Sequence, residues 1–312
     1  MVQTKVYQIL VLFFLSSTVQ AKLEEKVSWD SKLYDDHPLV GKIWSSSSER
    51  FLSVKNFEEA LISARYLILG EKHDNPDHHA LQLSIIEHLI AENNLSLLAF
   101  EMMDSDSQEI LNDIQAERLD GLNAIKDYLN WDTEGWEWSY YGPLVKSAYE
   151  SAIPMVGSNI TNSRMMEIYG LESLPPEINV LEEEIIQQLN TDIDESHCGL
   201  LPESQFPAMV RVQQGRDYSM SQSLGSKDNE KTKVLIAGNY HARKDLGVPN
   251  YLLANNVNLN SDEIVSVSFM EVDPLEMEPH GYIQKHDETA AYDYVWFTPV
   301  ISEMDYCASL RK

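Results

Sequence analysis

The chain has 312 residues, of which 43% are apolar, enough for one large or two modest domains with a real core. Its 50 acidic and 23 basic side chains give a formal net charge of −27 at pH 7. So large an acidic excess argues against binding of nucleic acids or anionic membrane surfaces through bulk electrostatics. It fits an exported, well-solvated protein, in which any anionic ligand would need a local cluster of basic residues.

The first 21 residues have the pattern of a secretory signal peptide. Lys5 gives a weakly basic start, residues 9–15 form an apolar run too short to span a bilayer, and the small residues at 19–21 suit signal peptidase. We expect a cleaved signal at residues 1–21 and a mature protein that begins near Lys22. An uncleaved anchor is the alternative. No cysteine directly follows the apolar run, so the sequence does not predict a lipoprotein.

The chain has two cysteines, Cys198 and Cys307. An even pair in an exported protein favours one disulfide. It would close a loop of roughly a hundred residues, for which the chain-entropy model gives about 4 to 5 kcal/mol of stabilisation. Two free buried thiols are one alternative, and metal ligation by His197 with Cys198 is another.

The amino-terminal half begins with residues 22–60, which are polar and mixed and indicate an amino-terminal arm. An apolar run at 65–70 predicts a strand, and Asp77 can cap a following helix that runs to about Glu92. Residues 95–100 form a second apolar strand that ends on Glu101.

Two helical insertions interrupt the later strands, at about 104–150 and 176–226. The first insertion is rich in tryptophan, which suits either the wall of an apolar ligand site or a small core. A third strand is predicted at 153–157, a helix around 164–169, and a fourth strand at 234–237.

The last two strands are predicted at 264–272 and 292–298. Six strands with helices between them predict an α/β fold: a mostly parallel sheet flanked by helices, with helical insertions.

Two of the predicted strands end in the same motif, Gly-x-x-His. Gly70 leads to His73 in the first copy, and Gly238 leads to His241 in the second. In an open parallel sheet the carboxyl ends of the strands are where ligands bind. The repeated motif therefore indicates a metal or cofactor site at this edge, although glycines also end strands in loops that merely contain histidine.

The sequence resembles the ChaN-like haem-binding uptake family of the Tiki superfamily. The matching segments are residues 70–79, 141–144, 197–199, 238–249 and 292–299, together with Glu101, Gln213, Arg216 and Asp217. They span nearly the whole mature chain in the same order and spacing. The resemblance implies a ChaN-like haem-binding α/β domain at 61–312, export to the periplasm or cell envelope of a bacterium, and a role in haem or iron uptake or storage.

The resemblance also implies partners. These are haem itself and an outer-membrane haem receptor or a periplasmic carrier. The sequence leaves the oligomeric state open, and a homodimer is one candidate because a second protomer can complete a flat haem slot. Many relatives are lipoproteins, and the absence of the lipoprotein cysteine sets this chain apart from them.

A haem site needs an axial ligand for iron, an apolar slot and cations for the propionates. The candidates for the axial ligand are His73, His78, His79, Tyr141, Tyr240 and His241. The candidates for the propionates are Lys72, Arg243 and Lys244.

The wider superfamily implies an alternative, a metal-dependent hydrolase of the protease or esterase type. His73, His241 and Glu101 could hold Zn²⁺, Mn²⁺ or Co²⁺ with an open position for water. Glu71 or Glu101 could then act as general base, with Arg216 or Arg243 stabilising an oxyanion. The sequence favours a haem-binding protein over an enzyme without deciding between them.

Overall fold

The computed structural model describes residues 23, 26, 28–225, 230–286 and 289–310. The signal peptide predicted at residues 1–21 lies outside this part of the chain. Within the described ranges, no helix combines the length and the apolar character that a membrane crossing requires.

One large sheet organises the molecule. Its eight strands have the order β2-β1-β10-β7-β3-β6-β4-β5, and a separate pair joins β8 to β9. The bounds of the strands are β1 (Ile43–Ser45), β2 (Arg50–Leu52), β3 (Tyr66–Glu71), β4 (Leu95–Asp104), β5 (Met155–Asn159), β6 (Thr232–Gly238), β7 (Ile264–Glu271), β8 (Lys285–His286), β9 (Thr289–Ala290) and β10 (Tyr294–Thr298).

The strands from β10 to β5 are parallel to one another, whereas β1 and β2 pair antiparallel at one side of the sheet. All six strands that the sequence predicts are present, as β3, β4, β5, β6, β7 and β10. The predicted fold class, a mostly parallel α/β sheet flanked by helices, is confirmed. The two antiparallel strands come from the segment 22–60, which adds to the sheet through the pairing of Ile43 with Trp296.

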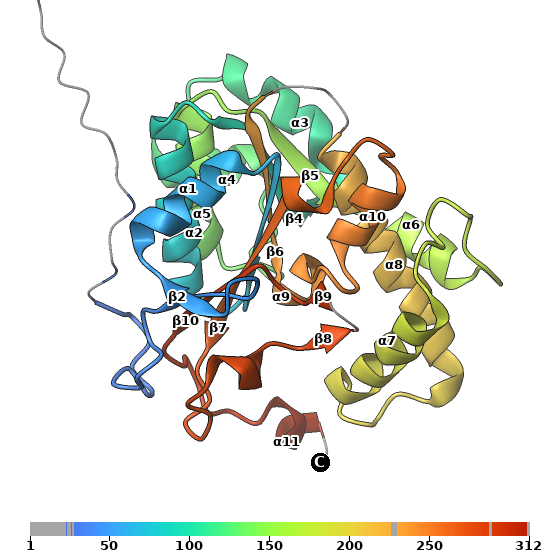
Figure 1. The fold of residues 1–312 in the computed structure, drawn as a ribbon. Helices are drawn as coiled ribbons and strands as arrows, with labels where there is room; N and C mark the ends of the chain where they lie inside the picture. The colour runs from blue at the N-terminus through green and yellow to red at the C-terminus, as the bar shows by residue number, and fades with distance from the viewer. Residues whose placement is uncertain (1–22, 24–25, 27, 226–229, 287–288, 311–312) are drawn as a thin grey trace, which may run out of the picture.

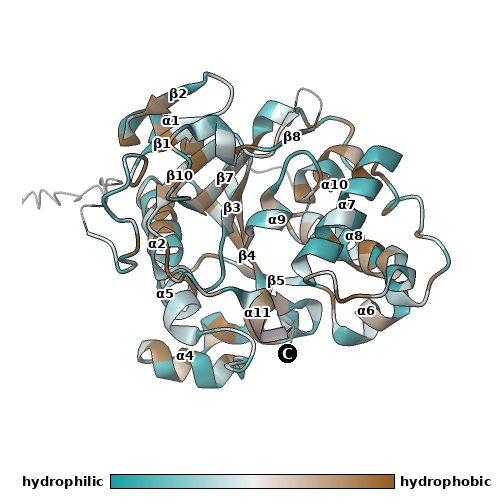
Figure 2. Ribbon diagram, turned by 90° about the horizontal axis from the view of Figure 1, so that it is seen from below, coloured by the Kyte–Doolittle hydropathy of each residue, from teal (hydrophilic) through white to brown (hydrophobic). Residues whose placement is uncertain are grey.

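Helices cover both faces of the sheet. Their bounds are α1 (Val54–Ser63), α2 (Pro76–Ala91), α3 (Gln108–Asp113), α4 (Gly121–Leu129), α5 (Trp138–Glu150), α6 (Asn162–Tyr169), α7 (Glu183–Ser196), α8 (Phe206–Ser223), α9 (Asn239–Ala242), α10 (Val248–Ala254) and α11 (Tyr306–Leu310). In Figure 1, α1, α2 and α5 lie on one side of the sheet, and α8 and α10 lie on the other. Figure 2 shows the same division from below, with α1, α2 and α5 on the left and α6, α7, α8 and α10 on the right.

The alternation of side chains along β3 explains this two-sided packing. Leu67 and Leu69 belong to the core beneath α2 and α5, whereas Tyr66 and Ile68 belong to the core beneath α8 and α10. Successive side chains of a strand point to opposite faces, so a continuous apolar run buries both faces of the sheet. All four side chains are at most 1% exposed.

The beginning of α2 differs from the sequence expectation. Asn75 is the N-cap residue, because its side chain accepts a hydrogen bond from the backbone N–H of Asp77 at 2.9 Å. The prediction that Asp77 caps the helix is therefore wrong. Asp77 lies in the first turn and accepts hydrogen bonds from Lys26 at 2.6 Å and from the backbone of Ser31 at 2.8 Å. It fixes the amino-terminal segment to the helix.

The predicted disulfide is present. It joins Cys198, just after α7, to Cys307 in α11, with 5.5 Å between the two Cα atoms. The bond ties the connection between α7 and α8, in the middle of the second helical insertion, to the carboxyl-terminal segment.

Candidate functional site

The two Gly-x-x-His motifs lie side by side because β3 and β6 are neighbouring parallel strands, with Glu71 opposite Gly238 in the register. Strand β4 pairs with the other side of β6 and brings Glu101 to the same edge. Gly70 lets helix α9 cross this edge closely, since a Cβ at Gly70 would lie 2.7 Å from the Cβ of Ala242. Three adjacent strands thus present polar side chains at one edge, the place where open α/β sheets bind ligands.

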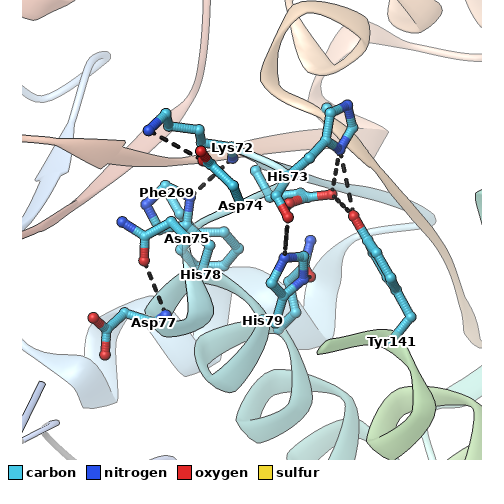
Figure 3. A network of polar contacts seen from close by, with 12 residues as sticks. Lys72, His73, Asp74, Asn75, Asp77, His78, His79, Tyr141 and Phe269 are labelled. Carbon is cyan, nitrogen blue, oxygen red and sulfur yellow. Dashed lines mark hydrogen bonds and ion pairs between the residues drawn. The ribbon is translucent and has the colours of Figure 1, made fainter. Parts of the chain in front are cut away.

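One polar cluster is built around Glu71, and we call it the Glu71 cluster: Glu71, His73, His79 and Tyr141. Oε1 of Glu71 accepts a hydrogen bond from the hydroxyl of Tyr141 at 2.8 Å and lies 2.8 Å from Nδ1 of His73. Nε2 of His79 lies 3.2 Å from Oε2 of Glu71 and 3.0 Å from the carbonyl oxygen of His73. Figure 3 shows Tyr141 and His79 directed toward His73 from different helices. Oε1 of this carboxylate, which is only 1% exposed, therefore has two polar partners, whereas Oε2 has no hydrogen-bond partner among the described residues and lies only within ion-pair distance of His79.

Aromatic side chains hold the imidazoles of this cluster in place. The ring of His79 stacks on Tyr140 with centroids 4.9 Å apart, and the ring of His73 meets Trp136 edge-on at 4.9 Å. His73 is the accessible member of the cluster, with 44% of its side chain exposed. Burial lowers the pKa of His73, but the hydrogen bond and charge of Glu71 outweigh this and raise the pKa above its ordinary value. Burial raises the pKa of Tyr141, so its hydroxyl stays protonated and serves as a donor.

A second polar cluster surrounds the other motif histidine, and we call it the His241 cluster: His241, Glu101, Asp217 and Gln213. Nδ1 of His241 lies 2.6 Å from Oδ1 of Asp217, and Nε2 lies 3.3 Å from Oε1 of Glu101. The backbone N–H of Gly238 donates to Oε2 of Glu101 at 2.7 Å, and the amide of Gln213 donates to Asp217 at 3.2 Å. Both ring nitrogens of His241 therefore face carboxylates.

His241 and Glu101 shift each other's pKa toward the charged form, whereas burial raises the pKa of Asp217. Burial lowers the pKa of His241, but the carboxylates of Glu101 and Asp217 outweigh this and raise the pKa to about 10. Burial raises the pKa of Glu101, but His241 and the Gly238 N–H outweigh it and lower the pKa to about 2. At neutral pH the imidazolium of His241 thus lies against the carboxylate of Glu101.

The three residues predicted to hold a metal ion come close together. Glu101 pairs with His241. His73 is near this pair, because a Cβ atom added at Gly238 would lie 3.0 Å from the ring of His73 and 3.6 Å from Oε2 of Glu101. Among the residues that the structure describes, however, no group of three His, Cys, Asp or Glu side chains has an arrangement that could hold a metal ion.

His78 lies in the first turn of α2 and supports the loop between β3 and α2. It is fully buried, its Nδ1 accepts a hydrogen bond from the backbone N–H of Lys72 at 2.9 Å, and its Nε2 lies 2.9 Å from the hydroxyl of Thr298. Burial holds the pKa of His78 well below its ordinary value, so the ring is neutral. Both nitrogens are engaged, and the ring joins the loop to strand β10.

The cations predicted to bind an anionic group already have carboxylate partners. Lys72 lies 3.1 Å from Glu271, and Arg243, only 7% exposed, donates from its Nε to Asp245 at 2.9 Å. Lys244 forms an ion pair at 2.9 Å with Asp293, which precedes β10. These three side chains stabilise the fold around the sheet edge.

Tyr240 lines a pocket of about 620 Å³, which we call the apolar pocket. Its hydroxyl donates to Oδ2 of Asp192 in α7 at 2.7 Å, and burial together with this hydrogen bond raises its pKa. The pocket lies among α6, α7, α8 and α9, and its lining is Met165, Met166, Tyr169, Asp192, Ile193, Ser196, His197, Met209, Val212, Gln213, Arg216 and Tyr240.

A smaller cleft of about 290 Å³ lies beside the carboxyl ends of β4 and β5, and we call it the polar cleft. Its walls include Glu101, Asn159 and two of the tryptophans, Trp131 and Trp136. Trp131 is only 9% exposed and also belongs to the core beneath α5, so the tryptophan-rich insertion serves both as core and as cleft wall. Arg216 lines this cleft as well as the apolar pocket.

The sequence did not reveal two of these arrangements. In α8, Nδ1 of His241 lies 2.6 Å from Oδ1 of Asp217, and the neighbouring Arg216 donates to Asn159 at 2.8 Å. The methionine wall of the apolar pocket was also missed, because it forms where α6 meets α7 and α8. The helical spacing of Gln213 and Asp217 was the one available signal for the first arrangement.

Comparison with known proteins agrees with this architecture. Residues 57–252 match the family model for haem-binding uptake, Tiki superfamily, ChaN. A solved structure described as cofacial heme binding to ChaN of Campylobacter jejuni has a TM-score of 0.66 and 26% sequence identity, and the match covers 81% of this chain and 95% of that chain. The erythromycin esterase EreC has a TM-score of 0.44 and 12% identity, covering 82% of this chain and 96% of that chain, a similarity too low to bear on function. No curated protein sequence matches the chain. With more than half of its residues matched by the family model, the chain belongs to the ChaN family of haem-binding uptake proteins in the Tiki superfamily.

Proposed function

We propose that this protein is an exported haem-binding protein of the bacterial cell envelope that takes part in the uptake or storage of haem or iron. Family membership and the heme binding of the Campylobacter jejuni relative support haem as the ligand. The signal-peptide pattern at 1–21 and the disulfide between Cys198 and Cys307 support export. An outer-membrane receptor or periplasmic carrier would be its partner, and a second copy of the chain could complete the site.

The apolar pocket is the observation that carries the proposal. Its volume of about 620 Å³ lies within the range of roughly 300 to 1,000 Å³ that small-molecule and cofactor sites occupy. Methionine, isoleucine, valine and tyrosine side chains form most of its wall, which suits the face of a porphyrin. The residues present therefore fit the ligand.

Tyr240 is the residue of this wall that is best suited to an axial position. Bound haem supplies an iron atom that takes an axial protein ligand, and tyrosine is one of the side chains that fill this role. The Tyr240 hydroxyl donates to Asp192 at 2.7 Å, and this hydrogen bond orients the phenol oxygen in the wall of the pocket. His78, His79 and Tyr141, by contrast, are at most 3% exposed and engaged in hydrogen bonds, which disfavours their access to a large planar ligand.

The test is a titration of residues 22–312 with ferric haem, followed by the Soret absorbance and repeated with Tyr240→Phe and His73→Ala. We expect a saturable shift that Tyr240→Phe alters in position or affinity and that His73→Ala leaves intact. His73→Ala is the control for the sheet edge, where the imidazole is the accessible polar group of the Glu71 cluster. A shift altered by His73→Ala alone would place the ligand at the sheet edge, and no saturable shift would contradict haem binding.

A further inference from the structure

Arg216 differs from the other cations near the sheet edge. Its guanidinium donates to Oδ1 of Asn159 at 2.8 Å and contacts Sδ of Met165 at 3.6 Å, and no described carboxylate forms an ion pair with it. Lys72 and Arg243, in contrast, are each held by carboxylates. Within the described residues, the guanidinium of Arg216 thus lies at the pocket without a direct ion-pair partner.

Arg216 lies between two cavities, the apolar pocket and the polar cleft, and lines both. On one side is the apolar pocket, whose wall is mostly methionine and other apolar side chains. On the other side is the polar cleft, with Glu101, Asp104 and Asn159 among its walls. An amphipathic ligand whose apolar body fills the pocket would therefore place its polar edge at Arg216.

The hydrogen bond to Asn159 orients the guanidinium without using its full capacity. A guanidinium carries five N–H donors in a fixed planar fork, and the contacts to Asn159 and Met165 engage one donor on each terminal nitrogen. The remaining donors match the two oxygens of a carboxylate, which such a fork binds in a bidentate manner.

The charge of the whole protein makes this single cation important. A net charge of −27 repels any anionic ligand at long range, and Asp192 and Glu101 add negative charge to the two cavities. A ligand with acidic groups is retained here only if a local cation compensates for that repulsion.

We propose that Arg216 binds a carboxylate of the ligand where the apolar pocket meets the polar cleft, so that the site selects amphipathic acids such as haem with free propionates over their neutral esters. This inference rests on the proposed haem-binding function and names the ligand group that the site recognises. It assigns the propionate contact to Arg216 and leaves Lys72 and Arg243 with their structural ion pairs.

The experiment compares ferric haem with haem dimethyl ester, in which both propionates are neutral, in the same detergent solution. The proteins are the wild type, Arg216→Met, Arg216→Lys and Arg211→Met. Arg211 is the matched control, because it lies in the same helix, its removal changes the net charge equally, and it donates to the backbone oxygen of Tyr169 at 3.0 Å without lining the pocket. Thermal unfolding checks that each variant is folded.

We expect the wild type and Arg211→Met to bind haem at least about tenfold more tightly than the ester, as the loss of a charge-assisted hydrogen bond implies. Arg216→Met should bind both porphyrins with nearly equal affinity, and Arg216→Lys should keep part of the preference because it retains the charge without the fork.

Equal affinities of the wild type for haem and ester would overturn this inference while haem binding itself stands, even if Arg216→Met fails to fold. A preference that survives in Arg216→Met would do the same. No binding of either porphyrin by the wild type would overturn the proposed function and this inference together.

Discussion

Nε2 of His241 lies 3.3 Å from Oε1 of Glu101, and this contact joins the second Gly-x-x-His motif to the end of the neighbouring strand β4. Both side chains are buried, at 7% and 6% exposure. Because each partner shifts the other toward its charged form, the pair remains ionised over a wide range of pH. The same contact that arranges the sheet edge therefore also makes the stability of the protein depend on pH.

Glu101→Gln is expected to destabilise the protein most between about pH 4.5 and 6.5. The folded-state pKa of Glu101 is about 2, below its ordinary 4.5, so its contribution is complete above pH 4.5 and is lost as the pH falls toward 2. The folded-state pKa of His241 is about 10, above its ordinary 6.5, so its contribution is complete below pH 6.5 and is lost as the pH rises through 10. Breaking a buried pair costs about 3 to 5 kcal/mol of unfolding free energy within that window.

Urea unfolding of both proteins from pH 3 to pH 10 measures this difference. Glu150→Gln is the control, because Glu150 forms an exposed helical pair with Lys146 and should change stability by no more than about 0.5 kcal/mol. A difference between wild type and Glu101→Gln that stays constant over the whole range would show that the pair does not carry the charges described above.

Tyr141→Phe removes one of the hydrogen bonds that satisfy the buried carboxylate of Glu71. The hydroxyl of Tyr141 donates to Oε1 of Glu71 at 2.8 Å, and the loss of a donor to a buried charged group costs about 1 to 3 kcal/mol. Tyr140→Phe is the matched control in the same helix turn, since the ring of Tyr140 stacks on His79 and the substitution keeps the ring. Equal unfolding midpoints in denaturant for the two variants would contradict the role given to the Tyr141 hydroxyl.

Reduction of the disulfide should lower the thermal midpoint. Cys198 and Cys307 are 109 residues apart, and closing a loop of this length stabilises a protein by about 4 to 5 kcal/mol in the chain-entropy model. We expect a decrease on the order of 10 °C when reductant is added. The double variant Cys198→Ser/Cys307→Ser should melt at the lower temperature with or without reductant. Identical melting of the wild type in both conditions would refute the predicted contribution.

The sheet was readable from the sequence because its strands are continuous apolar runs. Leu67, Ile68 and Leu69 bury both faces of β3, and such a run bounded by Gly70 is typical of a central parallel strand. The convergence of His73 and His241 was also predictable, since parallel strands end at the same edge.

The side chains that contact these histidines could not be predicted from the strand pattern. Asp217 reaches His241 from α8, and Tyr141 reaches Glu71 from α5, across separations that helical spacing within one segment does not encode. The apolar pocket depends on how α7 packs outside α8, which no local pattern specifies. The basic residues Lys72 and Arg243 are visible in the sequence, but their ion-pair partners are not. Glu271 reaches Lys72 through the tertiary structure, and Asp245 reaches Arg243 through a local turn.

The measurement that tests the haem-binding account most directly is a ferric haem titration of the wild type beside two tryptophan variants. Met209→Trp places a larger ring in the wall of the apolar pocket, whereas Met304→Trp adds the same ring at a site that is 66% exposed and outside the pocket. The account predicts a saturable Soret shift in the wild type and in Met304→Trp, and a much weaker or absent shift in Met209→Trp. Equally tight binding by all three proteins, or no saturable shift in the wild type, would contradict it.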